Sequence, residues 1–173
     1  MPSRKPAIYL LLAAMSDFPS QVTAASCDTH AERPAASDRY VIKGPEVYDN
    51  TTDLTWQRCS IGQYWKDRAG CIGNAQHYNW NDTSALGSTS GWRLPTLNEL
   101  STLVSPTCKP PAIDETIFPN TDTGIGYWTN IIGTGTGPLA DTPFAWAVIF
   151  KDGSADQYPT SHLGAIRLVR SGK

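Results

Sequence analysis

The sequence is poor in charge and has no long apolar run, and each absence argues against a class of protein. Only 17% of the residues are charged against 40% that are hydrophobic, which does not fit a disordered chain. The net charge of −2 and the pI near 5.8 argue against a general nucleic-acid binder, which needs a basic surface. No apolar run reaches ~18 residues, so no membrane span is expected.

Metal-ligand patterns are also missing. The sequence has no CxxC pair, and its three histidines, His30, His77 and His162, are scattered along the chain. We therefore expect no metal and no cofactor. What is abundant is tryptophan (6), glycine (14) and proline (13), which together indicate a loop-rich globular domain with an aromatic core.

The N-terminus has the three-part pattern of a secretory signal peptide. Arg4 and Lys5 form a short basic region, residues 6–15 are apolar, and residues 22–25 (VTAA) supply small side chains for cleavage. A buried N-terminal helix is one alternative. Lipidation of Cys27 is another, although the residue three positions before it is alanine, where a larger aliphatic side chain is usual.

These features predict the organisation of the chain. We expect a signal peptide at 1–25, cleaved near Ala25, an N-terminal tail at 26–37, and one folded domain at 38–173. A domain of this size can bury one proper hydrophobic core. The expected location is secreted or periplasmic, with a lipoprotein as the lesser alternative.

The cysteine count agrees with export, because an even number in an exported domain indicates disulfides. The four cysteines are Cys27, Cys59, Cys71 and Cys108, and they allow three ways of forming two disulfides. Cys59 and Cys71 bracket an 11-residue segment with turn-forming glycines, so we favour Cys59–Cys71. That choice leaves Cys27–Cys108, which would tie the N-terminal tail to the domain.

The first part of the domain predicts short strands. Residues 40–42 and 46–48 have strand character, residues 49–53 (DNTTD) form a dense turn cluster, and residues 54–58 alternate as a returning strand. Residues 74–86 are expected to be partly helical, ending before the glycines at 87 and 91.

The clearest local motif is a capping box at Thr96 and Glu99, in which each side chain can satisfy the backbone N–H of the other residue. The apolar residues that follow keep helical spacing at Leu97, Leu100, Leu103 and Val104. Pro106 is expected to end this helix, because proline lacks the N–H donor.

The C-terminal third predicts antiparallel strands at 126–130, 144–150 and 165–170. Both faces of 144–150 are apolar, so this strand should be central, and Asp152-Gly153 directly after it indicates a hairpin turn. Helices followed by an antiparallel sheet indicate an α+β domain with about two helices, stabilised by disulfides.

A series of spaced motifs extends over residues 38–171. In chain order they are DNxTxLxW from Asp49, GWRLPTxxEL from Gly91, PAID from Pro111, FPxT from Phe118, YWT from Tyr127, AWxVxFxxG from Ala145, and RLVR from Arg167. This series resembles the bacterial Lcl C-terminal domain family. The resemblance implies a fold similar to C-type-lectin-like and sulfatase-modifying-factor domains, and a best-known relative is the C-terminal domain of a collagen-like adhesin that binds sulfated glycans.

The chain departs from that family in three ways. Asp53 stands where the family usually has glycine, but aspartate tolerates a left-handed φ, so the turn should survive. No collagen-like Gly-X-Y tract precedes the domain, and the chain is net acidic, which weakens an inference of sulfated-glycan binding.

The same motifs separate expected structural residues from expected ligand contacts. The structural set is Trp92, Arg93, Pro95, Thr96, Glu99, Trp128, Trp146 and Arg167. The three tryptophans should be core residues, and Arg167, in an apolar strand, should pair with a buried carboxylate, which is Glu99 only if the helix cap does not fully occupy it. Tyr64, Trp65 and Tyr158 fall in loops, where an exposed ring can stack on a sugar, and with Arg170 they are the candidate ligand-binding residues.

Other motifs are better explained without chemistry. Trp80-Asn81-Asp82 resembles a calcium-lectin tripeptide by coincidence, and Asn81 or Asp82 should cap a helix. Residues 49–53 lack the glycine and bidentate glutamate of an EF-hand loop, and the adjacent acids at 114 and 115 fit a solvated loop.

We therefore expect an exported, non-catalytic binding module, glycan-binding or adhesive, whose partner is a glycan or a cell-surface protein. It should bind no nucleic acid, should not span a membrane, and can oligomerise. The alternative is a protein-interaction or assembly subunit of a cell-surface structure. An enzyme related to sulfatase-modifying factors is a weaker alternative, because the cysteines are better explained as structural bridges.

Overall fold

The computed structural model describes residues 36–86, 91–105, 110–136 and 139–173. The predicted signal peptide, most of the predicted tail, Pro106 and the predicted Cys27–Cys108 bridge lie outside these residues. Within them, no helix is both long and apolar enough to span a membrane.

The described chain is mostly β structure. Its elements are α1 (Ala36–Arg39), β1 (Tyr40–Lys43), β2 (Glu46–Asp49), β3 (Leu54–Gln57), β4 (Tyr64–Lys66), β5 (Gly70–Ile72), β6 (Tyr78–Asn79), the 3-10 helix η1 (Trp80–Ala85), α2 (Leu97–Ser101), β7 (Gly126–Thr134), β8 (Pro143–Ile149), β9 (Ser154–Pro159), β10 (Leu163–Gly164) and β11 (Val169–Ser171). The expected α+β class is thus corrected, because the helices are all short.

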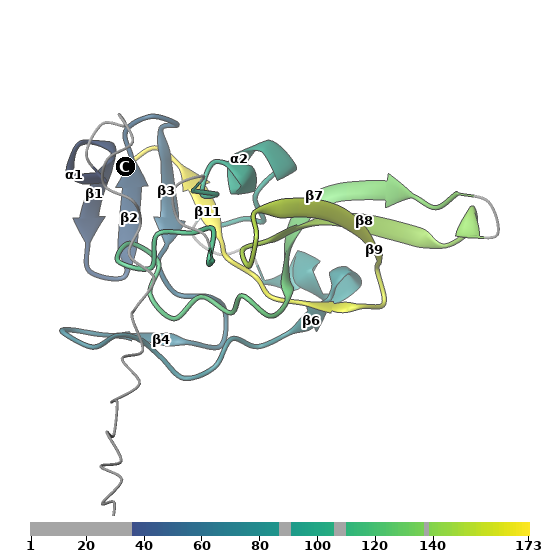
Figure 1. The fold of residues 1–173 in the computed structure, drawn as a ribbon, viewed down its shortest axis with the longest axis horizontal. Coiled ribbons are helices and arrows are strands. Elements are labelled where there is room, and N and C mark those ends of the chain that lie inside the picture. Colours follow the sequence, from purple (N-terminus) through teal and green to yellow (C-terminus); the bar gives the residue numbers. More distant parts are fainter. Residues whose placement is uncertain (1–35, 87–90, 106–109, 137–138) are drawn as a thin grey trace, which may run out of the picture.

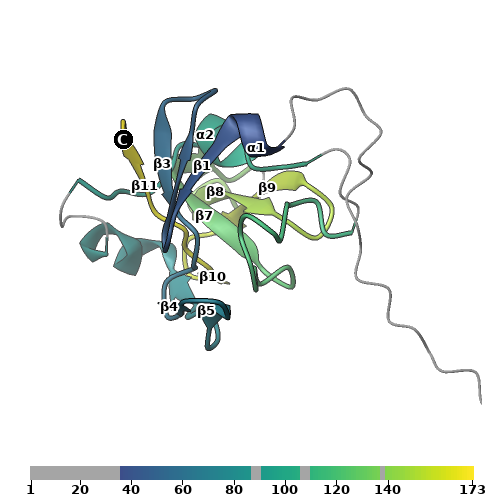
Figure 2. The same cartoon turned by 90° about the vertical axis from the view of Figure 1, so that its left-hand side faces the viewer.

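Two larger antiparallel sheets form the body (Figure 1). One has the strand order β1-β2-β3-β11, and the other has the order β7-β8-β9. Two small antiparallel pairs, β4–β5 and β6–β10, complete the strands. Figures 1 and 2 place the β4–β5 hairpin below the four-stranded sheet, and Figure 1 shows the β7–β8 hairpin extending away from it.

The N-terminal strands follow the sequence prediction. Asp53 has φ 54°, so it occupies the left-handed position expected of it in the turn between β2 and β3. Asp49 at the end of β2 is buried and pairs with Arg39, whose Nη2 lies 2.6 Å from Oδ2. Burial alone would raise the pKa of Asp49, but the hydrogen bonds from Arg39 and from the Thr51 N–H hold it below its usual value.

The capping box is confirmed. The Thr96 hydroxyl accepts a hydrogen bond from the Glu99 N–H at 3.2 Å, and the Glu99 carboxylate accepts one from the Thr96 N–H at 2.7 Å. Arg93 also donates to both carboxylate oxygens, at 2.7 and 2.8 Å. The helix ends at Ser101, earlier than predicted, and a tight turn carries Leu103 onto the core.

Strand β8 is central, as predicted, and its two faces enter two core clusters. Val148 belongs to the cluster with Trp56 and Leu100, whereas Ala147 belongs to the cluster with Trp128. The turn at Asp152-Gly153 is present, with Gly153 at φ 82°. Trp128 is buried as expected.

Two of the expected core tryptophans are not fully buried. Trp146 and Trp92 are half-buried, and Trp92 packs against the outside of the core cluster that contains Trp128. Trp146 lies on the same face of β8 as the buried Val148, but opposite the register shift in β7 between Trp128 and Ile132.

The last predicted strand is divided. Residues 164–169 are buried and run between the two sheets, from the end of β10 at Gly164 to the start of β11 at Val169. Single bridges connect this segment to both sides, Tyr127 with Ala165 and Arg93 with Val169. The C-terminal segment therefore joins the sheets instead of forming one long strand, and it places Arg167 at the centre of the molecule.

Candidate functional site

Arg167 is wholly buried and is held by neutral oxygens. Its Nη1 donates to the carbonyl groups of Gln57 and Arg58, and its Nη2 donates to Thr121 Oγ1 at 2.9 Å and more weakly to Ser60 Oγ at 3.4 Å. Burial lowers the pKa of Arg167.

The predicted pairing of Arg167 with a carboxylate is wrong. Within the described residues its hydrogen-bond partners are carbonyl and hydroxyl oxygens only, and its guanidinium lies 4.9 Å from the Phe118 ring centroid. Glu99 is already occupied by Arg93 and by its cap. Arg93 holds the pKa of the Glu99 carboxyl below its usual value.

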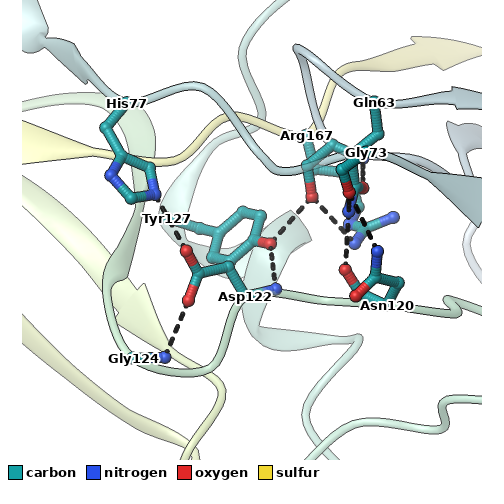
Figure 3. A network of polar contacts seen from close by, with 9 residues as sticks. Gln63, Gly73, His77, Asn120, Asp122, Gly124, Tyr127 and Arg167 are labelled. Atoms are coloured by element: carbon teal, nitrogen blue, oxygen red, sulfur yellow. Dashed lines mark hydrogen bonds and ion pairs between the residues drawn. The ribbon is translucent and has the colours of Figure 1, made fainter.

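A polar network leads from Arg167 toward the surface (Figure 3). The hydroxyls of Ser60 and Tyr127 are 2.8 Å apart, and the Tyr127 hydroxyl accepts from the Asp122 N–H at 3.0 Å. The Asp122 carboxylate then lies 2.8 Å from His77 Nε2. A chain of polar groups thus connects the buried guanidinium to a partly exposed His–Asp pair.

A second branch of the network fixes the loops around Gln63. Its Oε1 accepts from the Ser60 N–H at 2.9 Å, and its Nε2 donates to the Asn120 carbonyl at 2.8 Å. The Asn120 amide donates in turn to the Gly73 carbonyl at 3.0 Å (Figure 3). Three loops distant in sequence are therefore held together through two amide side chains.

The β4–β5 hairpin carries two of the three predicted aromatic ligand residues, Tyr64 and Trp65. The prediction that these rings lie in loops is wrong, because Tyr64 and Trp65 are in β4 and Tyr158 is in β9. Its base is closed by a disulfide between Cys59 and Cys71, the pair favoured from the sequence. Trp65 lies directly opposite Cys71 in the strand register, and the Arg58 guanidinium stacks over the Trp65 ring at 4.3 Å. Tyr64, the preceding residue, is 60% exposed.

A cleft of about 320 Å³ opens beside this hairpin, and we call it the Trp65 cleft. Its lining includes Glu46, Gln57, Ser60, Gln63, Trp65 and Trp92. Glu46 and Gln57 are direct partners in the β2–β3 register, which places both side chains at one position of the sheet. The volume falls within the range of about 300–1,000 Å³ that small-molecule sites occupy.

Arg170 is positioned at the edge of the Trp65 cleft by two of its lining residues. Its Nη2 lies 2.7 Å from Glu46 Oε2, and its guanidinium lies 5.1 Å from the Trp92 ring centroid. Sequence reasoning placed Trp92 in the core and did not identify Glu46 or Gln57. The outward alternation of polar residues in 46–57 is the pattern that could have indicated them.

A larger polar cleft of about 510 Å³ lies next to the first, and we call it the His77 cleft. Its lining includes Gln63, Asn74, His77, Asn120, Asp122 and Thr123. Gln63 lines both clefts, so the two are contiguous. His77 and Asp122 were not identified from the sequence, because 45 residues separate them.

Tyr158 belongs to a different cleft, of about 280 Å³, which shares no lining residue with the other two. There it packs edge-to-face on Trp128, with ring centroids 6.5 Å apart. The structure thus brings Trp65 and Arg170 to one cleft, leaves Tyr64 exposed on the adjacent hairpin, and places Tyr158 elsewhere.

The remaining sequence motifs have structural roles. Asn79 caps η1 by accepting from the Asp82 N–H, so the expected cap at Asn81 or Asp82 is wrong. The Asp114 carboxylate accepts from both the backbone and the hydroxyl of Thr116. In the described part of the chain, no three His, Cys, Asp or Glu side chains are grouped to hold a metal ion.

Comparison with known proteins gives one result. The family model described as the Lcl C-terminal domain matches residues 45–170, which is more than half of the chain and includes both contiguous clefts. Searches among curated proteins and among solved structures gave no match. The chain therefore belongs to the Lcl C-terminal domain family.

Proposed function

We propose that the protein is an exported, non-catalytic carbohydrate-binding module, of C-type-lectin-like fold, that binds its glycan in the Trp65 cleft. The observation that carries this proposal is the lining of that cleft. Two indole rings, Trp65 and Trp92, share it with the carboxylate of Glu46 and the amides of Gln57 and Gln63. Sugars present apolar C–H faces and polar hydroxyl edges, and this lining offers a partner for each.

The rings are held in place before a ligand arrives. Arg58 stacks on Trp65, and the Trp65 Nε1 donates to Asp67 at 2.9 Å, so the indole has a fixed orientation. Arg170 stacks on Trp92 in the same manner. Because side chains that are ordered in advance lose less entropy on binding, this arrangement favours affinity.

The charges of the cleft favour a neutral ligand. Arg170 is engaged with Glu46, and Arg58 uses its guanidinium nitrogens on the backbone carbonyls of Gly44, Thr116 and Ile117. A polyanion needs cations that are not already paired. Arg170 is neutralised by Glu46, and the N–H groups of Arg58 are committed to carbonyl oxygens, so neither guanidinium is free to bind a sulfate. This supports a neutral sugar more than a sulfated one.

A glycan array tests the proposal. The oxidised protein, without its predicted signal peptide, would be screened with calcium and with EDTA, and we expect selective binding that survives EDTA. The W65A variant should lose at least tenfold in affinity, equivalent to ~1.4 kcal/mol. The K66A variant is the matched control, because it truncates an exposed side chain of the same hairpin that lines neither cleft. Absence of binding by folded protein would refute the proposal.

A second candidate is an assembly or protein-interaction subunit, and a separate surface favours it. Ile131, Ile132 and Leu139 are 37%, 63% and 51% exposed, and they belong to the β7–β8 hairpin that projects from the body (Figure 1). A contiguous exposed apolar patch marks an interaction site, and these three side chains on one projecting hairpin are the candidates for one. Sedimentation of wild type and I132D would test it: loss of an oligomer in the variant alone would support this function.

A further inference from the structure

We infer that the ligand is a neutral oligosaccharide that extends from the Trp65 cleft across Gln63 into the His77 cleft. This inference rests on the proposed function and goes further, since it assigns a second binding region and a ligand class. The shared position of Gln63, which lines both clefts, is the observation that joins them.

The boundary between the clefts is fixed in place. Gln63 accepts from the Ser60 N–H and donates to the Asn120 carbonyl, so both ends of its amide are anchored (Figure 3). Ser60 is buried and in contact with Tyr127, which also accepts from the Asp122 N–H. One network therefore sets the walls on both sides of Gln63, and a ligand lying across it meets two preformed surfaces.

The two clefts differ in chemistry in a way that suits successive sugar units. The Trp65 cleft has indole rings for stacking, whereas the His77 cleft is lined mainly by amide, hydroxyl, imidazole and carboxylate groups. The His77 and Asp122 side chains are each 34% exposed, so a ligand can reach them beside their mutual hydrogen bond. A second sugar unit would be held there by hydrogen bonds through its hydroxyl groups.

The lining also indicates the charge of the ligand. Among the described residues that line the His77 cleft there is no Lys or Arg, and Asp122 is the acidic member, paired with His77. An anionic unit would meet a carboxylate and no unpaired cation. A neutral chain avoids this repulsion, and the side-chain amides of Asn74 and Asn120 line the cleft in which its hydroxyl groups would lie.

Titration calorimetry with oligosaccharides of increasing length tests the inference. The probes are glucose, cellobiose and cellotetraose, N-acetylglucosamine, chitobiose and chitotetraose, and a heparin-derived tetrasaccharide as the anionic comparison. We expect at least one neutral tetrasaccharide to bind tenfold or more tightly than its monosaccharide. H77A and N74A should reduce this ratio toward one without weakening the monosaccharide, and K151A, on the exposed turn after β8, should leave it unchanged.

The outcomes separate this inference from the proposed function. Equal affinity for monosaccharide and tetrasaccharide, with both lost in W65A, would overturn the extended site and leave the function standing. Binding of the heparin tetrasaccharide alone would overturn the neutral ligand class. If folded wild type binds no probe at all, the proposed function fails and this inference fails with it. Circular dichroism of H77A and N74A confirms that the variants are folded.

Discussion

Removal of the Cys59–Cys71 disulfide should weaken both the fold and ligand binding. The bridge closes the base of the β4–β5 hairpin, and Trp65 lies directly opposite Cys71 in the register. Cys59 itself lines the Trp65 cleft. The hairpin is only three residues long on each strand, so little else in its ladder holds the indole in position.

The expected loss of stability follows from the length of the closed loop. The two cysteines are 12 positions apart, and a loop of about this size restricts the unfolded chain by ~3 kcal/mol in the chain-entropy account. In a domain of this length each kcal/mol corresponds to about 2–4 °C in Tm, so the melting temperature should fall by about 6–12 °C. Loss of the buried sulfur atoms adds to this effect.

The assay compares oxidised wild type with C59A/C71A and with C27A/C108A. Urea unfolding followed by circular dichroism gives the free energy of unfolding, and calorimetry with the best glycan probe gives the affinity. A non-reducing peptide map of wild type should recover the Cys59–Cys71 link. Only C59A/C71A should lose affinity, because only this bridge adjoins Trp65. A change below about 1 kcal/mol, or unchanged affinity, would refute the reasoning.

Three further predictions concern the core and its cap. T96A should lower the free energy of unfolding by ~1 kcal/mol because an N-cap is lost, while T96S keeps the hydroxyl and should be near wild type in urea unfolding. The Arg93 guanidinium lowers the pKa of Glu99 below its unfolded value, so the carboxylate stabilises the folded state fully above pH ~4.3. This contribution is lost as the pH falls through the lower folded pKa. The free energy of unfolding of E99Q should therefore fall less between pH 7 and pH 3 than that of wild type. R167M should lower the free energy of unfolding in urea by about 2–6 kcal/mol, because two buried carbonyls each lose a donor at ~1–3 kcal/mol. An unchanged midpoint would mean that the desolvation cost of the guanidinium cancels its hydrogen bonds.

Features that depend on neighbours in sequence were predictable. The capping box at Thr96 and Glu99 needs residues only three positions apart, and the turn at Asp152-Gly153 needs only a glycine that accepts positive φ. The extent of elements was harder to predict. The helix that starts at Leu97 stops after five residues because the chain turns to place Leu103 in the core, and no local residue type records that turn.

The site itself depends on contacts between distant residues. The sequence identified Trp65 and Arg170 as ligand residues, but it could not place Trp92 beside them. That position follows from the bridge between Arg93 and Val169 of β11, which pairs with β3. The partners of Arg167 were predicted incorrectly for a related reason. A buried arginine usually has a carboxylate partner, yet here the Nη1 of Arg167 donates to backbone carbonyls 110 and 109 positions away. Every residue has a backbone carbonyl, so no residue type in the sequence indicates these partners.

The position of Arg167 links the stability of the fold to the geometry of binding. Ser60 lines the Trp65 cleft and Thr121 lines the His77 cleft, and both hydroxyls accept from the same guanidinium. A neutral side chain could fill the same volume, but it could not donate to four oxygens on two segments at once. The cost of burying the charge is therefore offset by an arrangement that holds both cleft walls at a fixed separation, which is what a ligand extending across Gln63 requires.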